Sequence, residues 1–182
     1  MTDSRVLLDA KAIDRTLKRM ADQIIELHGG SDAPLVLVGI QRRGVQLAGR
    51  LQQLIRDREG IDVPRGALDI TLYRDDLQTV GPRPVVGATD LPWALEGSTC
   101  IIVDDVLYTG RTVRAALDEL ADFGRPARIG LAVLVDRGGR ELPIQPDIVG
   151  KVVQLRKGGR VDVQVSELDG HDAVTITEGA DA

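Results

Sequence analysis

The stretch from Ile101 to Val113, IIVDDVLYTGRTV, constrains the fold more than any other part of the chain. The run from Cys100 to Val103 is apolar and without alternation, which is typical of a short strand buried on both faces of a parallel sheet. Asp104 and Asp105 follow at once, and a loop at Thr109 to Thr112 opens a segment whose apolar residues recur at helical spacing. We therefore predict a strand, an acidic pair, a small-residue loop and a helix.

The loop before this helix predicts a phosphate site. The first N–H groups of a helix lack partners and lie at the positive end of its dipole, so a loop of Thr and Gly there forms a cradle for phosphate. Gly110 lets the backbone approach closely. Hydrogen bonds to a charged group contribute about 1.5–3 kcal/mol each, whereas the dipole adds about 0.3–1 kcal/mol. Direct contacts from the loop should therefore dominate phosphate binding.

The two acids point to a different ligand group. Asp104 and Asp105 stand at the carboxyl end of the predicted strand, where open α/β sheets place their ligands. Carboxylates repel a phosphate, but they suit the hydroxyls of a polyol or a hydrated Mg²⁺. A lone Asp-Asp pair would more often cap the helix, and a lone glycine would merely turn the chain. The whole ordered string favours a phosphorylated sugar as the ligand.

Polar clusters follow two further predicted strands. Leu35 to Ile40 is a buried-strand run that ends in Gln41-Arg42-Arg43-Gly44, before a helix that ends near Gly60. Guanidinium forks match phosphate oxygens, so the two arginines predict a second anion site. Ile129 to Val135 is another such run and ends in Asp136-Arg137. In doubly wound sheets these strand ends lie side by side.

Short elements and one long connection make up the remainder. Asp9 is a predicted N-cap for a helix that runs to His28, and Gly66 to Tyr73 alternates like a half-buried strand. The segment from Arg74 to Ser98 shows no periodicity. A connection of this length in a compact domain is more often a functional lid than a loop without a role. Residues 147–182 alternate Val and Ile with polar residues in short pieces.

Composition excludes several classes of protein. The 182 residues fit one domain with a proper core, and the 2% aromatic content disfavours base-stacking platforms. One cysteine, Cys100, excludes an internal disulfide, and with two histidines it cannot supply a zinc site. The chain shows neither a membrane-length apolar run nor a secretory signal, so we expect a cytoplasmic protein. A net charge of −5 argues against a generally basic surface but leaves room for a local basic patch.

The string VDDVLYTGRT resembles the signature of the type I phosphoribosyltransferases, which bind 5-phosphoribosyl 1-pyrophosphate (PRPP). Within that superfamily it is similar to the bifunctional pyrimidine-operon regulator and uracil phosphoribosyltransferase family, as are TLYRDDL, VDRG and RELPI. Tyr108 stands where purine transferases commonly carry an acid. The resemblance implies a single α/β domain over residues 1–182, with a mainly parallel twisted sheet flanked by helices and a small β-rich hood formed mainly by residues 147–182.

The resemblance also implies roles for individual residues. It assigns catalysis to Asp104, Asp105 and Arg43, with Mg²⁺ entering alongside PRPP and the two acids as its candidate ligands. The phosphate cradle comprises Tyr108, Thr109, Gly110, Arg111 and Thr112, and the pyrophosphate loop comprises Arg42, Arg43 and Gly44. The flexible loop carries Arg74, Asp75, Asp76 and Arg83, although the two acids fit an ordinary loop equally well. The base side carries Asp136, Arg137 and Val161.

Two functions follow from the resemblance. One is an enzyme that converts uracil and PRPP to UMP and pyrophosphate, and the other is a regulator that senses UMP, UTP or guanosine nucleotides and binds pyrimidine-operon leader mRNA. The candidate RNA-binding residues are Lys18, Arg19, Arg140 and Lys151. Asp22, Gly139 and Gln145 stand where the family typically has cations, and fewer cations weaken the salt-dependent part of RNA binding. An enzyme without RNA binding and a purine phosphoribosyltransferase are the alternatives, and the family implies a homodimer or a larger homo-oligomer.

Overall fold

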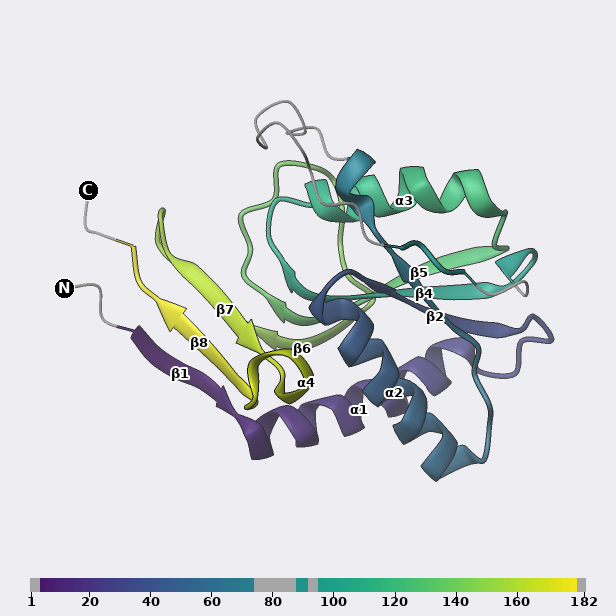
Figure 1. The fold of residues 1–182 in the computed structure, drawn as a ribbon, viewed down its shortest axis with the longest axis horizontal. Helices are drawn as coiled ribbons and strands as arrows, with labels where there is room; N and C mark the ends of the chain where they lie inside the picture. Colours follow the sequence, from purple (N-terminus) through teal and green to yellow (C-terminus); the bar gives the residue numbers. More distant parts are fainter. Residues whose placement is uncertain (1–3, 74–87, 92–94, 180–182) are drawn as a thin grey trace.

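The structure is a computed structural model that describes residues 4–73, 88–91 and 95–179. Its described part contains a parallel five-stranded sheet in the order β3-β2-β4-β5-β6 (Figure 1). In this order the strands are β3 (Arg65–Leu68), β2 (Leu35–Ile40), β4 (Thr99–Leu107), β5 (Arg128–Asp136) and β6 (Ile148–Val152). The predicted parallel α/β sheet is thereby confirmed.

Helices cover both faces of this sheet. Helices α1 (Ala10–His28) and α2 (Arg43–Glu59) lie on one face, and α3 (Arg111–Phe123) lies on the other (Figure 1). Ile101 of β4 belongs to the core cluster beneath α1 and α2, whereas Ile102 belongs to the cluster beneath α3. The central strand is therefore buried on both faces, as its unbroken apolar run predicts.

The ends of α1 follow the predicted capping pattern. The N–H of Ala12 donates to Oδ1 of Asp9 at 2.8 Å, so Asp9 is the N-cap, and the N–H of Gly29 donates to the carbonyl of Ile25 at 2.9 Å. Among the described helices, none combines the length and the apolar character that crossing a membrane requires.

A second, smaller sheet forms the hood and differs from the expected one. It contains β1 (Ser4–Asp9), β8 (Ala173–Thr177) and β7 (Arg160–Gln164), all antiparallel, with the short helix α4 (Ser166–Asp169) between β7 and β8. The hood therefore includes an N-terminal strand that the sequence analysis did not predict, while β6, expected in the hood, is an edge strand of the central sheet. The hydrogen-bonding partner of β1 is β8, at the far end of the chain, so local periodicity did not reveal it.

The strand expected over residues 66–73 was wrong in its second half. Strand β3 ends at Leu68, and a 3-10 helix, η1 (Ile70–Tyr73), replaces the predicted continuation. The reason is Asp69, whose Oδ1 accepts the backbone N–H of Thr71 at 2.9 Å and also its hydroxyl. Such local side-chain bonds compete with the strand ladder and turn the chain.

Candidate active site

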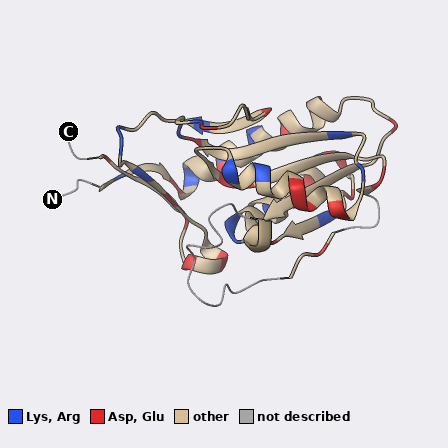
Figure 2. Ribbon diagram, turned by 90° about the horizontal axis from the view of Figure 1, so that it is seen from above, with Lys and Arg blue, Asp and Glu red and all other residues tan. Residues whose placement is uncertain are grey.

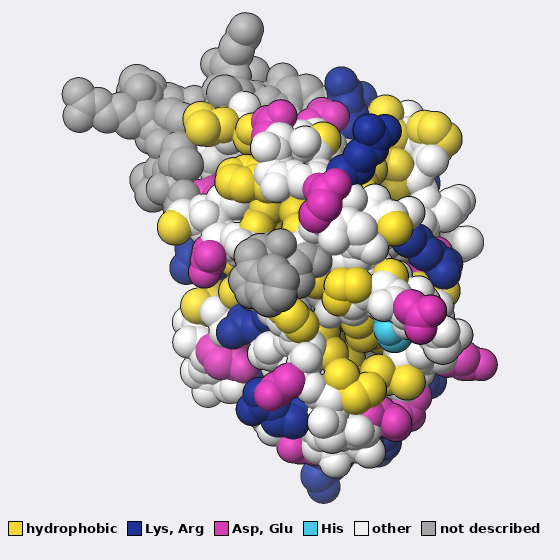
Figure 3. All heavy atoms as spheres, turned by 90° about the vertical axis from the view of Figure 1, so that its right-hand side faces the viewer, with side chains coloured by type: hydrophobic (Ala, Val, Ile, Leu, Met, Phe, Trp, Pro, Cys, Tyr) yellow, Lys and Arg dark blue, Asp and Glu magenta, His cyan; other side chains and the backbone are white. Residues whose placement is uncertain are grey.

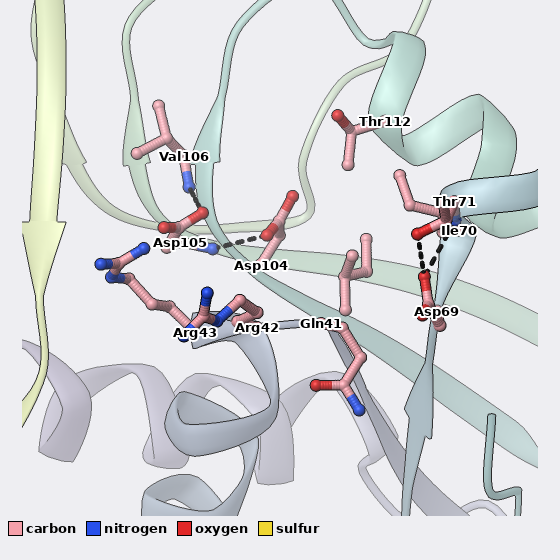
Figure 4. A pocket seen from close by; sticks show the side chains of 11 residues that line it. Gln41, Arg42, Arg43, Asp69, Ile70, Thr71, Asp104, Asp105, Val106 and Thr112 are labelled. Carbon is pink, nitrogen blue, oxygen red and sulfur yellow. Dashed lines mark hydrogen bonds between the residues drawn. The ribbon is translucent and has the colours of Figure 1, made fainter. Parts of the chain in front are cut away.

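A pocket of about 310 Å³ opens at the carboxyl end of the central sheet (Figure 4). It brings together three groups that lie far apart in the sequence: the acidic pair of β4, the arginines at the start of α2 and the start of α3. The strand expected to end at Val103 continues to Leu107, so the two acids lie within β4 rather than after it. The lining residues are Ile40, Gln41, Arg42, Arg43, Asp69, Ile70, Thr71, Asp104, Asp105, Val106 and Thr112. The structure thus joins the predicted sugar and anion sites in one cavity.

The acidic pair carries an electrostatic cost. Asp104 is only 6% exposed, and burial raises the pKa of its carboxyl well above the ordinary value, with the charge of Asp105 raising it further. The N–H of Asp105 donates to Oδ1 of Asp104 at 2.9 Å, and the N–H of Val106 donates to Oδ1 of Asp105 at 2.8 Å (Figure 4). A perturbed carboxyl of this kind in a cleft makes Asp104 a candidate functional residue.

Two glycines let the start of α2 approach this pair. A Cβ added to Gly44 would lie 2.5 Å from the carbonyl oxygen of Val103, and one added to Gly39 would lie 2.5 Å from the carbonyl oxygen of Gly44. The helix therefore begins directly against β4 at Val103. The peptide bond between Gln41 and Arg42 is cis, and α2 begins without a side-chain cap. Its first amides therefore have no side-chain acceptor from the cap residue and suit an anion.

The side chain of Arg43 turns toward the hood. Its Nη2 donates to Oδ1 of Asp169 on α4 at 2.9 Å, and its Nε donates to Oδ2 at 3.2 Å. The bidentate bond is the main cause that raises the pKa of Arg43 and lowers the pKa of Asp169. Figure 4 shows the guanidinium beside Asp105 and turned away from Thr112. Sequence reasoning missed Asp169, because 126 positions separate the two residues and no motif links them.

The predicted phosphate cradle lies at the start of α3. Gly110 is the N-cap residue at φ 93°, without a side-chain cap bond, and Thr112 lines the pocket. The carbonyl of Thr109 accepts the N–H groups of Glu141 and Leu142 at 2.9 and 3.1 Å, and Nε of Arg111 lies 2.8 Å from Oε2 of Glu141. The segment after β5 therefore braces the loop from outside, while the start of α3 opens toward the pocket.

The base-side residues of β5 contact the same loop. Asp136 forms a bidentate ion pair with Arg140 at 2.7 and 2.8 Å, which is the main cause that lowers the pKa of the Asp136 carboxyl. Arg140 also donates to the carbonyls of Tyr108 at 3.1 Å and Ile144 at 2.8 Å. The guanidinium carbon of Arg137 lies 3.9 Å from the centroid of the Tyr108 ring. Together these contacts fix Tyr108 at the edge of the cradle.

The remaining site predictions have mixed outcomes. Val161 lies on β7, opposite Ile176, and packs against the core cluster beneath α1 and α2. Asp69 and Thr71 line the pocket although the sequence analysis did not select them, because both lay in the middle of a predicted strand. The lid candidates Arg74, Asp75, Asp76 and Arg83 lie outside the described residues.

Three of the candidate RNA-binding residues lie on α1 and β6, which contact each other, and the fourth has a different environment. Arg19 donates to the carbonyls of Val149 and Gly150 at 3.2 and 2.5 Å, Lys18 pairs with Asp14 at 2.6 Å, and Lys151 is exposed on β6. The guanidinium of Arg140 instead points inward to Asp136, and its side chain is 15% exposed. Asp22, expected to weaken the basic face, pairs with Arg58.

Charges of both signs are mixed over the molecule. Acidic and basic residues are both scattered over the ribbon (Figure 2), and they are interspersed with apolar side chains on the face opposite the hood (Figure 3). This distribution agrees with the expectation that any basic patch is local.

Magnesium fits the site only as an ion shared with a substrate. In the described ranges, no group of three or more His, Cys, Asp or Glu side chains is placed to hold a metal. Asp104 and Asp105 nevertheless provide two carboxyls in the pocket. Mg²⁺ is commonly bound by one or two carboxylates together with substrate phosphates, and this donor set matches that pattern.

Comparison with known proteins identifies the class. The family model described as phosphoribosyl transferase domain matches residues 4–166, so the chain belongs to the phosphoribosyltransferase family. The bifunctional protein PyrR of Chloroflexus aurantiacus is 55% identical over 180 residues, which cover 99% of this chain and 98% of that protein. The bifunctional protein PyrR of Thermus thermophilus is 54% identical over 172 residues, 94% of each chain. Within the phosphoribosyltransferases, the chain thus falls in the group of bifunctional PyrR proteins.

Solved structures confirm the fold. The hypoxanthine phosphoribosyltransferase of Trypanosoma cruzi superposes with a TM-score of 0.73 at 19% identity, over 97% of both chains. A hypoxanthine-guanine phosphoribosyltransferase from Bacillus anthracis gives a TM-score of 0.66 at 19% identity, over 84% of this chain and 85% of that one. These similarities establish the type I phosphoribosyltransferase fold and say nothing about which base this chain uses.

Proposed function

We propose that this protein is a uracil phosphoribosyltransferase and a nucleotide-sensing regulator of pyrimidine genes that acts by binding RNA. One observation carries the enzymatic part: Asp104 and Asp105 share a pocket with Arg42 and the open start of α3. The relatives that are more than 50% identical in sequence carry the name bifunctional protein, and this name supports both the enzymatic and the regulatory role. In the reaction, the bond from ribose C1′ to a pyrophosphate oxygen breaks and its electron pair leaves with pyrophosphate. A bond from C1′ to N1 of uracil forms, and N1 loses its proton.

The pocket residues divide this work by charge. Thr112 and the amides at the start of α3 hold the 5-phosphate, a group that does not react and that fixes the orientation of the ribose. Asp104 and Asp105 accept hydrogen bonds from the ribose hydroxyls and favour the positive charge that develops on the sugar. Arg42 and the amides at the start of α2 stabilise the negative charge of the leaving pyrophosphate.

Magnesium is the cofactor of this proposal. Asp104 and Asp105 would hold the ion together with PRPP, and when bound it neutralises negative charge on the departing pyrophosphate. Neither carboxyl is engaged by a cation in the described contacts, because the bonds that Asp104 and Asp105 accept come from backbone N–H groups.

Uracil is the proposed base because of the residue at the cradle edge. Tyr108 and Arg137 stack there, and neither is a carboxylate that would take a proton from a purine. The test is turnover of PRPP with uracil, adenine, hypoxanthine and guanine in parallel. We expect product with uracil alone, and activity with a purine but not with uracil would overturn the proposal.

The regulatory part rests on the exposed cations of α1 and β6. Lys18 and Lys151 lie on exposed stretches of these elements, which meet where Arg19 binds the backbone of β6. A filter-binding titration of the protein's own pyrimidine leader RNA across salt concentrations tests it. We expect saturable binding whose affinity falls with salt, and a smaller salt slope for Lys151→Gln. Absence of saturable binding at low salt would favour the enzyme-only alternative.

The same proposal extends to the organisation of the protein. We place it in the cytoplasm as a single phosphoribosyltransferase domain that assembles into a homodimer or a larger homo-oligomer. Analytical ultracentrifugation with and without UMP measures the assembly, and a monomer under both conditions would refute that part while leaving the chemistry untouched.

A further inference from the structure

The hood is attached to α2 through two arginines of one helix face. Arg50 donates to Glu167 at 2.5 Å, to Asp172 at 2.8 Å and to the hydroxyl of Ser166 at 3.0 Å. Arg43, about two helical turns earlier, makes the bidentate pair with Asp169. Helix α4 therefore presents two carboxylates, Glu167 and Asp169, to the two arginines of α2. One of these arginines, Arg43, also lines the pocket.

The two attachments differ in their surroundings. Arg50 does not line the active-site pocket, and its side chain is 20% exposed in a network of three partners. Arg43 lines the pocket beside Asp105, and its side chain is 34% exposed. The first attachment is a stable anchor, whereas the second lies where an anionic ligand of the pocket can reach it.

Release of Arg43 would leave no unpaired buried carboxylate. Oδ2 of Asp169 also accepts the backbone N–H of Val165 at 2.8 Å, so that carboxylate keeps a partner without the arginine. Arg50 would still hold α4 through Glu167 and Asp172. The Arg43 pair can therefore exchange while the hood stays docked.

We propose that Asp169 is an affinity-determining residue of the pyrophosphate site, because its carboxylate occupies the anion-binding edge of Arg43 until pyrophosphate replaces it. This inference rests on the proposed function, which supplies the pyrophosphate. Binding of pyrophosphate then transfers the guanidinium from the hood to the ligand. The carboxylate of Asp169 thereby lowers the affinity for pyrophosphate and speeds the release of this product.

The experiment compares two neutral substitutions on the same short helix. Asp169→Asn keeps an oxygen for the N–H of Val165 and removes the charge that holds Arg43, whereas Glu167→Gln removes an equal charge that contacts only Arg50 and Ser166 among the described residues. Binding of inorganic pyrophosphate with Mg²⁺ to the full-length proteins is measured by isothermal titration calorimetry. For a partly exposed ion pair we expect the dissociation constant to fall about two- to fivefold in Asp169→Asn. We expect no change in Glu167→Gln.

Each other outcome is decisive. An equal gain in both variants would mean a general charge effect, and weaker binding in Asp169→Asn would mean that Asp169 positions Arg43 for the ligand; either result overturns the inference. The double variant Asp169→Asn, Arg43→Gln should lose the gain relative to Arg43→Gln alone. If the wild-type protein binds no pyrophosphate, the proposed function itself fails. Thermal melting of every variant shows whether it is folded.

Discussion

The guanidinium of Arg137 lies against the ring of Tyr108, with its carbon 3.9 Å from the ring centroid, and Gly139 also borders that ring. A Cβ added to Gly139 would lie 2.4 Å from Cε2 of Tyr108. The glycine at this position is therefore coupled to the placement of the tyrosine. Gly139, which the sequence analysis related only to RNA binding, therefore also affects the base side of the site.

We predict that Gly139→Ala weakens the binding of uracil more than the binding of PRPP. The new methyl group displaces the Tyr108 ring, and the backbone at φ 76° is unfavourable for alanine. The KM for uracil should rise several-fold while the KM for PRPP changes little, as initial-rate kinetics would measure. Gly138→Ala is the matched control, because Gly138 has φ 68° with no atom within 4 Å of an added Cβ. Gly138→Ala should cost about 1–2 kcal/mol of stability without the change in KM, and equal kinetic effects in both variants would contradict the prediction.

We predict that Asp104→Asn stabilises the protein while it abolishes most activity. Burial raises the pKa of this carboxyl, so the folded state disfavours its charged form and an uncharged amide removes that penalty. The free energy of unfolding at neutral pH should rise by about 1–2 kcal/mol. Because the folded pKa is raised, the penalty is absent below the unfolded value of about 3.9 and grows as pH rises toward the folded pKa. Denaturant unfolding at pH 7 and below pH 4 measures the difference, and a destabilised variant would refute this account.

The pH dependence of turnover tests how uracil loses its proton. In the part of the chain that the structure describes, Tyr108 and Arg137 carry no carboxylate and the carboxylate of Asp136 is paired with Arg140, so we expect uracil to react as its anion. Turnover at saturating PRPP should rise from neutral toward alkaline pH. A flat profile over this range would indicate a side-chain base in the pocket.

We predict that Arg140 stabilises the segment that braces the phosphate cradle. Arg140→Ala leaves the partly buried carboxylate of Asp136, which is 14% exposed, with the N–H of Gly138 as its remaining donor, and the loss of the ion pair costs about 1–3 kcal/mol. The pKa of Asp136 is lowered in the fold, so this stability is present above about 3.9 and is lost as pH falls through the folded pKa. The gap in unfolding free energy between wild type and variant should therefore narrow in acid. Arg140→Lys keeps the charge but not the two-pronged bond, and it should recover only part of the loss.

Several elements could be predicted from the sequence because their signals are local. The buried run of β4 and the Asp9 cap of α1 depend on neighbours within a few positions. The end of β4 was predicted too early, because two acids after an apolar run resemble a strand end although the ladder with β5 continues to Leu107. The strand predicted over residues 66–73 was wrong in its second half although the cause is equally local. The alternation of apolar and polar residues favoured a strand there, whereas the hydrogen bond from Thr71 to Asp69 forms a turn.

Other features depend on contacts between distant residues and left no local pattern. The sequence indicated that Arg43 and Arg140 were cations available for ligands, but the fold supplies Asp169 to the first and Asp136 to the second. Arg19 likewise bonds backbone carbonyls of β6 on one side of its helix. Motifs therefore located the pocket, whereas the partners of Arg43, Arg140 and Arg19 were decided by long-range contacts.

The pairing of β1 with β8 has a consequence for how the protein matures on the ribosome. Ser4 lies opposite Thr177, so β1 finds its partner only after all the residues between them have been made. Contacts of such high sequence separation form slowly. The central sheet, whose strands follow one another more closely, can assemble first. We expect the carboxylate that holds Arg43 to arrive late, so a nascent chain would have its phosphate cradle before its hood.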